Sequence, residues 1–159
     1  MGITVGDQAP DFTLKSKSGD DMNDISLSDY RDSKNVVILF FPLAYTGVCT
    51  DEMCSVSGGL ADYDALDAQV LGISVDSPFA QEAWAKENDI TIPLLSDFNK
   101  EVSAAYGSQF EDLIGFKGVA KRSAFVVDKS GVVRFASVSD DPTQLPDFDA
   151  IKACLQALS

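Results

Sequence analysis

Two uninterrupted apolar segments constrain this chain more than any other feature of its sequence. Residues 35–41 read Asn-Val-Val-Ile-Leu-Phe-Phe, and residues 69–75 read Gln-Val-Leu-Gly-Ile-Ser-Val. Runs of this length, rich in β-branched side chains and without polar alternation, are typical of strands buried on both faces. Pro42 ends the first run, since proline has no N–H for a sheet ladder. Both segments therefore predict central strands of a sheet that helices cover on each side.

The segments around these strands alternate between helical and extended patterns. Ser77-Pro78 has the chemistry of an N-cap followed by a first helical residue, and Asp128-Lys-Ser-Gly131 has that of a hairpin turn. The predicted elements are helices at 47–68, 77–87 and 99–106, an extended stretch at 90–95, strands at 123–127 and 132–138, and a last helix from about Pro146.

This order predicts an α/β protein with a thioredoxin-like fold, a central mixed sheet flanked by helices. Alternating strands and helices pair in parallel, and the late hairpin adds an antiparallel edge. The 159 residues contain no internal repeat and no linker, so we expect one domain over residues 1–159.

Charge and cysteine usage exclude several classes of function. The formal net charge is −13, which repels DNA and anionic lipid, so we expect no nucleic-acid and no membrane partner. The start of the chain lacks the basic head and apolar run of a signal peptide, which favours the cytoplasm. Three cysteines and no histidine argue against a secreted disulfide framework, a Cys-His or Ser-His-Asp triad and a zinc site. We therefore expect no metal and no other cofactor.

Cys49 follows the first buried strand and falls in the first turn of the predicted helix. Free backbone N–H groups and the helix dipole at such a position stabilise a thiolate. In proteins, a helix start lowers a cysteine pKa from about 8.5 to about 3.5–7.5. The sequence thus predicts a nucleophilic sulfur that needs no imidazole.

The segment Pro42-Leu-Ala-Tyr-Thr46-Gly-Val-Cys49 matches the Pro-x-x-x-Thr-x-x-Cys motif of the peroxiredoxins, the AhpC/TSA superfamily. The resemblance extends over nearly the whole chain, and several segments look like the alkyl hydroperoxide reductase E group. These segments are residues 6–14, 40–47, 92–98 and 122–128. The resemblance implies a thiol-dependent peroxidase that reduces hydrogen peroxide and organic hydroperoxides without a cofactor.

The resemblance also implies a role for each site residue. Cys49 is the peroxidatic cysteine, which becomes a sulfenic acid. Thr46 bonds the thiolate and orients the peroxide, and Pro42 shields the pocket. Arg122 stabilises the thiolate and the charge on the leaving oxygen, and Glu52 helps to hold that arginine.

Other interpretations of these residues stay open at this point. Lys121 is the rival cation beside Arg122, and Glu52 is also a first-turn acid that the helix dipole favours. Thr46 is equally suited to an N-cap.

The second cysteine, Cys54, lies five residues after Cys49, as in the bacterioferritin-comigratory group, where the corresponding cysteine is the resolving one. On an intact helix two such residues lie about 8–9 Å apart between Cα atoms, beyond the limit of about 7 Å for a disulfide. We therefore expect resolution by Cys54 through local unfolding of the helix. The alternatives are that Cys54 is a packing residue and an external thiol resolves Cys49. Cys154 lies on an apolar helix face and is expected in the core, with a remote resolving role as its alternative.

The resemblance implies a hydroperoxide substrate, a thioredoxin-like or small-thiol reductant and a homodimer. Tyr45, which lies in the loop before the predicted helix, is a candidate dimer contact. Two competing functions remain. A dithiol oxidoreductase should carry C-x-x-C after the first strand, whereas this chain has Cys49-Thr-Asp-Glu. A peroxide-sensing module would use the same thiol and react once instead of turning over.

Overall fold

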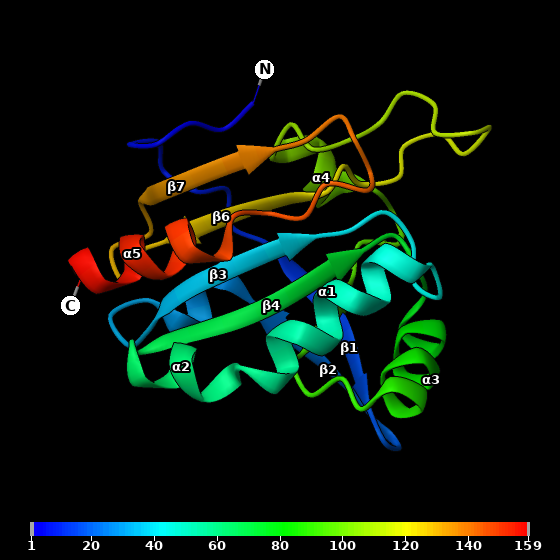
Figure 1. The fold of residues 1–159 in the computed structure, drawn as a ribbon, viewed down its shortest axis with the longest axis horizontal. Coiled ribbons are helices and arrows are strands. Elements are labelled where there is room, and N and C mark those ends of the chain that lie inside the picture. Colours follow the sequence, from blue (N-terminus) through cyan, green and yellow to red (C-terminus); the bar gives the residue numbers. More distant parts are fainter. Residues whose placement is uncertain (1, 159) are drawn as a thin grey trace.

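The computed structural model describes residues 2–158, whose strands form one mixed sheet in the order β2-β1-β5-β4-β3-β6-β7 (Figure 1). The strands are β1 (Thr13–Ser18), β2 (Asp21–Ser26), β3 (Asn35–Phe40), β4 (Ala68–Ser74), β5 (Leu94–Ser96), β6 (Ser123–Val127) and β7 (Val133–Val138). The helices are α1 (Gly47–Gly58), α2 (Leu60–Ala65), α3 (Pro78–Asn88), α4 (Glu101–Ala105) and α5 (Phe148–Leu158), with a 3-10 turn, η1 (Leu27–Tyr30).

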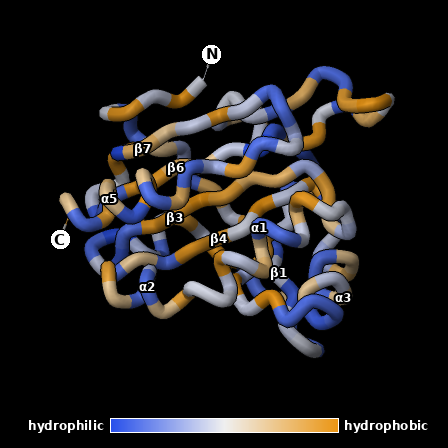
Figure 2. Tube along the Cα trace, in the orientation of Figure 1, coloured by the Kyte–Doolittle hydropathy of each residue, from blue (hydrophilic) through white to orange (hydrophobic). Residues whose placement is uncertain are grey.

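Strand β3 occupies the centre of the sheet and sends its side chains into two separate cores. Val37 and Leu39 belong to one apolar cluster, and Val36, Ile38 and Phe40 belong to the other. All six residues of the strand are buried, which explains why its sequence shows no polar alternation. Figure 2 shows this as hydrophobic colour along β3 and β4, with hydrophilic segments around them.

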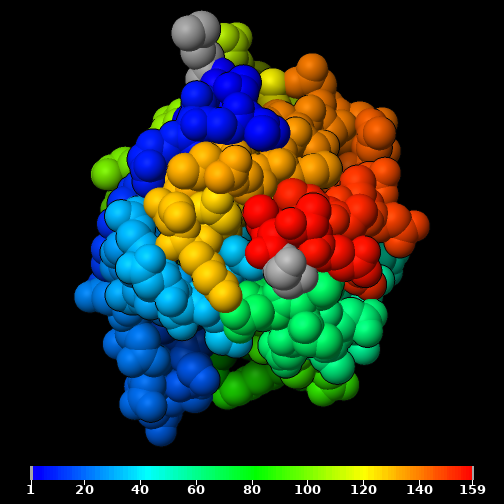
Figure 3. Space-filling view, turned by 90° about the vertical axis from the view of Figure 1, so that its left-hand side faces the viewer, coloured from blue at the N-terminus to red at the C-terminus, as the bar shows by residue number. Residues whose placement is uncertain are grey.

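Helices cover both faces of the sheet. Helices α1, α2 and α5 lie on one face (Figure 1), while η1 and α4 contribute Leu27 and Val102 to the core on the other. Figure 3 shows α5 at the C-terminal end of the chain packed against the β6–β7 hairpin and α2. Lys152 of α5 pairs with Asp62 of α2 at 3.2 Å. This ion pair connects α5 to α2 on the same face of the sheet.

The strand directions confirm the predicted mixed sheet. Strand β3 pairs in parallel with β4, which pairs in parallel with β5, and β6 pairs with β3 in the antiparallel sense. The β6–β7 hairpin forms as expected. Ser77 caps α3 as predicted, because its hydroxyl accepts the Ala80 N–H at 3.2 Å.

The prediction of one helix over 47–68 is wrong. The helix ends at Gly58, and α2 begins at Leu60 after Gly59, whose N–H bonds to the carbonyls of Ser55 and Val56. Two consecutive glycines lower the helix propensity by about 1 kcal/mol each, which explains the break. The shorter α1 carries both Cys49 and Cys54.

The N-terminal hairpin of β1 and β2 was not predicted. Its strands read Thr-Leu-Lys-Ser-Lys-Ser and Asp-Met-Asn-Asp-Ile-Ser, and they are mostly exposed, so they lack the apolar pattern by which strands are recognised. The turn uses Gly19 at φ 60°, in the left-handed region that favours glycine. The extended stretch at 90–95 forms a strand only from Leu94 to Ser96.

Helix α1 packs closely on the sheet at Gly72 of β4. A Cβ atom at this glycine would lie 3.2 Å from Met53 Sδ and 2.8 Å from Leu94 Cδ2, so only glycine leaves room for Met53 there. This close approach fixes the height of α1 above the sheet. No helix among the described residues is long and apolar enough to cross a membrane.

Candidate active site

The register between β3 and β6 brings distant parts of the chain together at one end of the sheet. Phe40, the last residue of β3, pairs with Ser123, the first residue of β6. The chain that leaves β3 therefore enters Pro42 and α1 beside Arg122, which directly precedes β6. The antiparallel pairing thus places Arg122 next to the helix start that carries Cys49.

Arg122 donates one hydrogen bond from each of its three nitrogen atoms. Nη2 lies 2.9 Å from Cys49 Sγ, Nη1 lies 2.7 Å from Glu52 Oε1, and Nε lies 2.8 Å from the carbonyl oxygen of Pro142. The guanidinium is planar and keeps its proton under all relevant conditions. It is therefore a permanent positive charge held 2.9 Å from the sulfur.

The site is closed to bulk water. Cys49 is 1% exposed, and the side chains of Arg122 and Glu52 are 2% and 0% exposed. Cys49 is the third residue of α1. It therefore lies in the first turn, where backbone N–H groups lack helical partners and the helix dipole places partial positive charge. Buried charges interact more strongly than exposed ones because water screens them less.

One guanidinium here faces two groups that can carry negative charge. With Cys49 and Glu52 both ionised, the buried cluster would hold one net negative charge, which burial disfavours. Burial raises the pKa of Glu52 to about 7 even though the charge and hydrogen bond of Arg122 lower it. Glu52 Oε2 has no hydrogen-bond partner among the described residues, so this oxygen lacks a donor that would stabilise the charged form.

Thr46 and Pro42 lie at the two ends of the loop before α1. Thr46 is exposed, and its hydroxyl donates to the carbonyl oxygen of Leu43 at 2.8 Å. Thr46 is the N-cap residue of α1, as the N-cap interpretation expects, but its side chain makes no capping hydrogen bond in the described chain. Its backbone oxygen accepts the N–H of Thr50. Pro42 is buried.

Lys121, the rival cation, points away from the sulfur. Its Nζ pairs with Asp140 at 2.5 Å and lies 5.8 Å from the centre of the Phe110 ring. Arg122 is therefore the cation that the fold brings to Cys49.

The other two cysteines lie outside the contacts of Arg122. Cys54 is half-buried on α1 and donates to the carbonyl oxygen of Asn88 at 3.4 Å. Cys154 is half-buried on α5, where its sulfur lies 3.6 Å from the carbonyl oxygen of Arg134. Burial raises the pKa of the Cys154 thiol. The expected core position of Cys154 is only partly met, because Ile151 and Leu155 are the fully buried residues of that helix face.

The sole tryptophan contacts the start of α1. The indole N–H of Trp84 donates to Thr50 Oγ1 at 3.0 Å, one residue after Cys49, and the ring packs against Phe41 and Tyr45. Trp84 fluorescence should therefore respond to events at this helix start.

Sequence reasoning missed the contact between Arg122 and Pro142. Pro142 lies in an acidic stretch, residues 140–149, whose composition is typical of solvated surface. Asp141-Pro142-Thr143 is a turn signal, but a turn signal does not indicate which part of the protein the turn packs on.

The chain is similar to known proteins over most of its length. Residues 5–136 match the AhpC/TSA family. The chain belongs to this family. It is 41% identical over 138 residues to alkyl hydroperoxide reductase E of Mycobacterium tuberculosis, with 86% of each chain covered. It is also 37% identical over 147 residues to a chloroplastic 2-cysteine peroxiredoxin of Chattonella marina var. antiqua, covering 88% of this chain and 73% of the relative.

The solved structure of Mycobacterium tuberculosis AhpC superposes with a TM-score of 0.85 at 29% identity, covering 99% of this chain and 94% of that one. The peroxiredoxin resemblance and the thioredoxin-like α/β fold are thereby confirmed. Like other AhpC/TSA proteins, the chain is a thiol-dependent peroxidase.

The raised pKa of Glu52 predicts how folding stability depends on pH. The folded state keeps the Glu52 proton up to about pH 7, whereas the unfolded chain releases it near 4.5. The stabilisation by neutral Glu52 is thus fully present below pH 4.5 and is lost as pH rises through about 7. We expect the free energy of unfolding to fall by about 1–3 kcal/mol across this window.

Urea unfolding of the wild type and of Glu52→Gln at several pH values measures this effect. The glutamine variant has no titratable group at this position, so its free energy of unfolding should depend less on pH between about 4.5 and 7. An identical pH dependence in both proteins would contradict the assignment.

Proposed function

We propose that this peroxidase uses Cys49 as its peroxidatic residue, held as a thiolate by Arg122 and the start of α1. The observation that supports this most directly is the distance of 2.9 Å between Arg122 Nη2 and Cys49 Sγ. A chain without histidine needs another source of positive charge beside a nucleophilic thiol, and a guanidinium at a helix start supplies it.

The reaction begins with attack of the Cys49 thiolate on the terminal oxygen of a hydroperoxide. An S–O bond forms, the O–O bond breaks, and the sulfur is oxidised to a sulfenic acid. The leaving oxygen takes up one proton and departs as water or an alcohol. Arg122 stabilises the negative charge that develops on this oxygen, as donors in an oxyanion site do.

We assign supporting roles to Thr46, Pro42 and Glu52. The Thr46 proton is already donated to Leu43, so its oxygen presents lone pairs to the O–H of an entering peroxide and orients it. The buried ring of Pro42 closes the pocket behind the sulfur. Glu52 positions Arg122 through the 2.7 Å pair with Nη1.

Substitution of Arg122 tests the proposal. Arg122→Met should lower the second-order rate constant for hydrogen peroxide by about 100-fold or more, because one transition-state donor is worth about 10²–10³ in rate. Cys49→Ser should abolish the reaction. Stopped-flow fluorescence of Trp84 measures the rate, since this ring bonds to α1 at Thr50.

The matched control is Arg134→Met, which removes an arginine at the other end of the β6–β7 hairpin, where its Nε bonds to Asp128 at 2.7 Å. This variant should react like the wild type. A wild-type rate in Arg122→Met, or equal losses in both variants, would contradict the assigned role of Arg122. Steady consumption of many equivalents of peroxide with a dithiol present separates the enzyme from a sensor that reacts once.

We further propose that Cys54 resolves the sulfenic acid and that α1 must unwind for this step. Both cysteines lie on one intact helix, where residues five apart are about 140° apart around the axis. Attack of the Cys54 thiol forms the disulfide and releases water, and a dithiol protein or a small thiol then returns both cysteines to thiols. Such a cycle suits a reducing compartment, so we place the protein in the cytoplasm.

Mass spectrometry after one equivalent of peroxide tests resolution by Cys54. The wild type should lose two hydrogens, and Cys54→Ser should instead keep a sulfenic acid that a sulfenic-acid reagent traps. Cys154→Ser is the control and should still form the disulfide. A persistent sulfenic acid in the wild type would contradict the role of Cys54 and favour an external thiol as the resolving group.

We also propose that the protein forms a homodimer through the aromatic surface beside the active-site loop. Tyr45, Phe79 and Phe98 are 54%, 64% and 63% exposed, and such side chains are typical of interfaces. Tyr45 packs on Trp84 of α3, and Phe79 and Phe98 line one shared hollow.

Analytical ultracentrifugation tests the dimer. Phe79→Ser should shift the wild-type dimer toward monomer by tenfold or more in dissociation constant, since burial of one phenylalanine contributes about 1.5–3 kcal/mol. Ile114→Ser, at an exposed apolar residue on another loop, should leave the equilibrium unchanged. A wild type that stays monomeric at all concentrations refutes the interface.

A further inference from the structure

The segment between β7 and α5 holds Arg122 at two points. This segment, residues 139–144, is called the Asp141 turn below. At its start, the Ser139 N–H donates to the backbone oxygen of Arg122 at 3.0 Å. Three residues later, the carbonyl oxygen of Pro142 accepts the Arg122 Nε–H at 2.8 Å. The turn therefore contacts both the main chain and the side chain of one residue.

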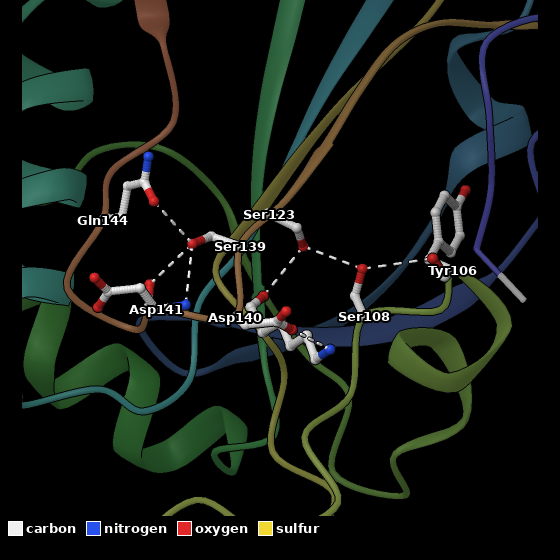
Figure 4. Close-up of polar contacts among 8 residues, drawn as sticks. Tyr106, Ser108, Ser123, Ser139, Asp140, Asp141 and Gln144 are labelled. Atoms are coloured by element: carbon white, nitrogen blue, oxygen red, sulfur yellow. Dashed lines mark hydrogen bonds and ion pairs between the residues drawn. The ribbon is translucent and has the colours of Figure 1, made fainter.

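The Asp141 turn is held in shape by its own hydrogen bonds. Asp141 Oδ1 accepts the N–H and the hydroxyl of Thr143 at 2.9 and 2.6 Å, and the Asp141 carbonyl oxygen accepts the Gln144 N–H at 3.1 Å. Figure 4 shows Ser139 in the middle of this network, with its hydroxyl directed at Asp141 and Gln144. The bonds from Thr143 hold the pKa of the Asp141 carboxyl below its ordinary value.

The bonds between Asp141 and Thr143 join the residues on either side of Pro142 in the sequence. Asp141 precedes it and Thr143 follows it, so the carboxylate bridge between the two fixes the direction in which the Pro142 carbonyl points. Proline adds rigidity because its ring restricts φ. The acceptor for Arg122 Nε is thus set by Asp141, an exposed residue that does not itself touch the guanidinium in any described contact.

The Nε contact decides where the rest of the guanidinium lies. The group is planar, and its donors diverge in a fixed fork. Glu52 holds Nη1 and Cys49 accepts from Nη2, but both lie on α1, which we propose unwinds during turnover. The Pro142 carbonyl is the contact to Arg122 that lies outside α1 and remains in place when the helix opens.

We propose that Asp141 is a positioning residue for peroxide reduction, which acts by fixing the Pro142 carbonyl that orients Arg122 toward Cys49. This inference rests on the proposed role of Arg122. Without the Pro142 contact at Nε, the ion pair with Glu52 would not by itself prevent rotation of the guanidinium. A loosened turn should therefore weaken the bond between Arg122 and the sulfur of Cys49.

The neighbouring residue offers a matched control. Asp140 lies in the same turn and is also exposed, but its carboxylate pairs with Lys121 and makes no described contact with Arg122. On the opposite side of Arg122, the Ser123 hydroxyl bonds to Ser108 at 3.2 Å (Figure 4). Substitution of Asp140 therefore removes an equal charge from the turn and leaves the supports of Arg122 intact.

Three variants test the inference, each measured for its rate with hydrogen peroxide, the ultraviolet absorbance of its thiolate at neutral pH and its thermal unfolding. Asp141→Ala should lose about tenfold in rate, the effect of one weakened hydrogen bond to a charged group, and should show less thiolate. Asp141→Asn retains an acceptor for Thr143 and should recover most of both. Asp140→Ala should resemble the wild type.

A double-mutant cycle distinguishes action through Arg122 from a general effect on the fold. In an Arg122→Met background, Asp141→Ala should cause no further loss of rate. An equal additional loss there, or a wild-type rate and thiolate content in Asp141→Ala, overturns the inference. Should Asp141→Ala unfold, Ser139→Ala, which removes the other side-chain support of the turn, takes its place with the same expectations.

The outcomes also separate this inference from the proposed function. A silent Arg122→Met would refute the role of Arg122 and the positioning role with it. A damaging Arg122→Met combined with a silent Asp141→Ala would leave the proposed function standing and refute the positioning role alone.

Discussion

A single buried guanidinium organises this protein. Arg122 is 2% exposed, and each of its three side-chain nitrogen atoms meets an acceptor: Cys49 and Glu52 of α1 and, far along the sequence, Pro142. A positive charge in an apolar interior is costly unless it is paired and hydrogen-bonded. The buried charge of Arg122 needs these hydrogen bonds, and the same bonds hold the first turns of α1 and the segment after β7 against Arg122. The thiol chemistry that we propose would use a cation that the fold must already stabilise.

The sheet register explains how the chain meets this requirement without histidine. Because Phe40 pairs with Ser123, the residue before β6 always lies beside the turn after β3. Neighbouring residues at the start of a strand point to opposite sides, so Arg122 is directed at the sulfur while Lys121 reaches Asp140 at the surface. A shift of one residue in this register would exchange the two cations.

The parts of the fold that could be predicted from sequence are those where burial leaves a pattern. Strands β3 and β4 were evident because both faces are covered, and the helix start at Cys49 was evident because it follows Pro42. The β1–β2 hairpin left no such pattern, since its residues are mostly exposed. The break between α1 and α2 depended on Gly58 and Gly59, whose effect on a helix varies with the packing around it.

The candidate site was predictable to a similar extent, and for a related reason. Cys49, Thr46 and Arg122 belong to a motif or to a segment that resembles the family, and α1 and β6 bring two of them into contact. The Asp141 turn belongs to an acidic surface stretch, and nothing in its composition indicates that one of its carbonyl groups faces inward. The direction of the Thr46 hydroxyl was likewise decided by a local carbonyl, that of Leu43.

The position of Glu52 between the two cysteines of α1 has a consequence for the order of events during turnover. Any rearrangement that brings Cys54 to Cys49 must displace the residues between them, and Glu52 then leaves its pair with Arg122. In the proposed cycle, the disulfide form therefore lacks the arrangement of Arg122 and Glu52 around Cys49. If Cys54 resolves Cys49 as proposed, the protein reacts with a second oxidant molecule only after reduction has allowed the helix to reform.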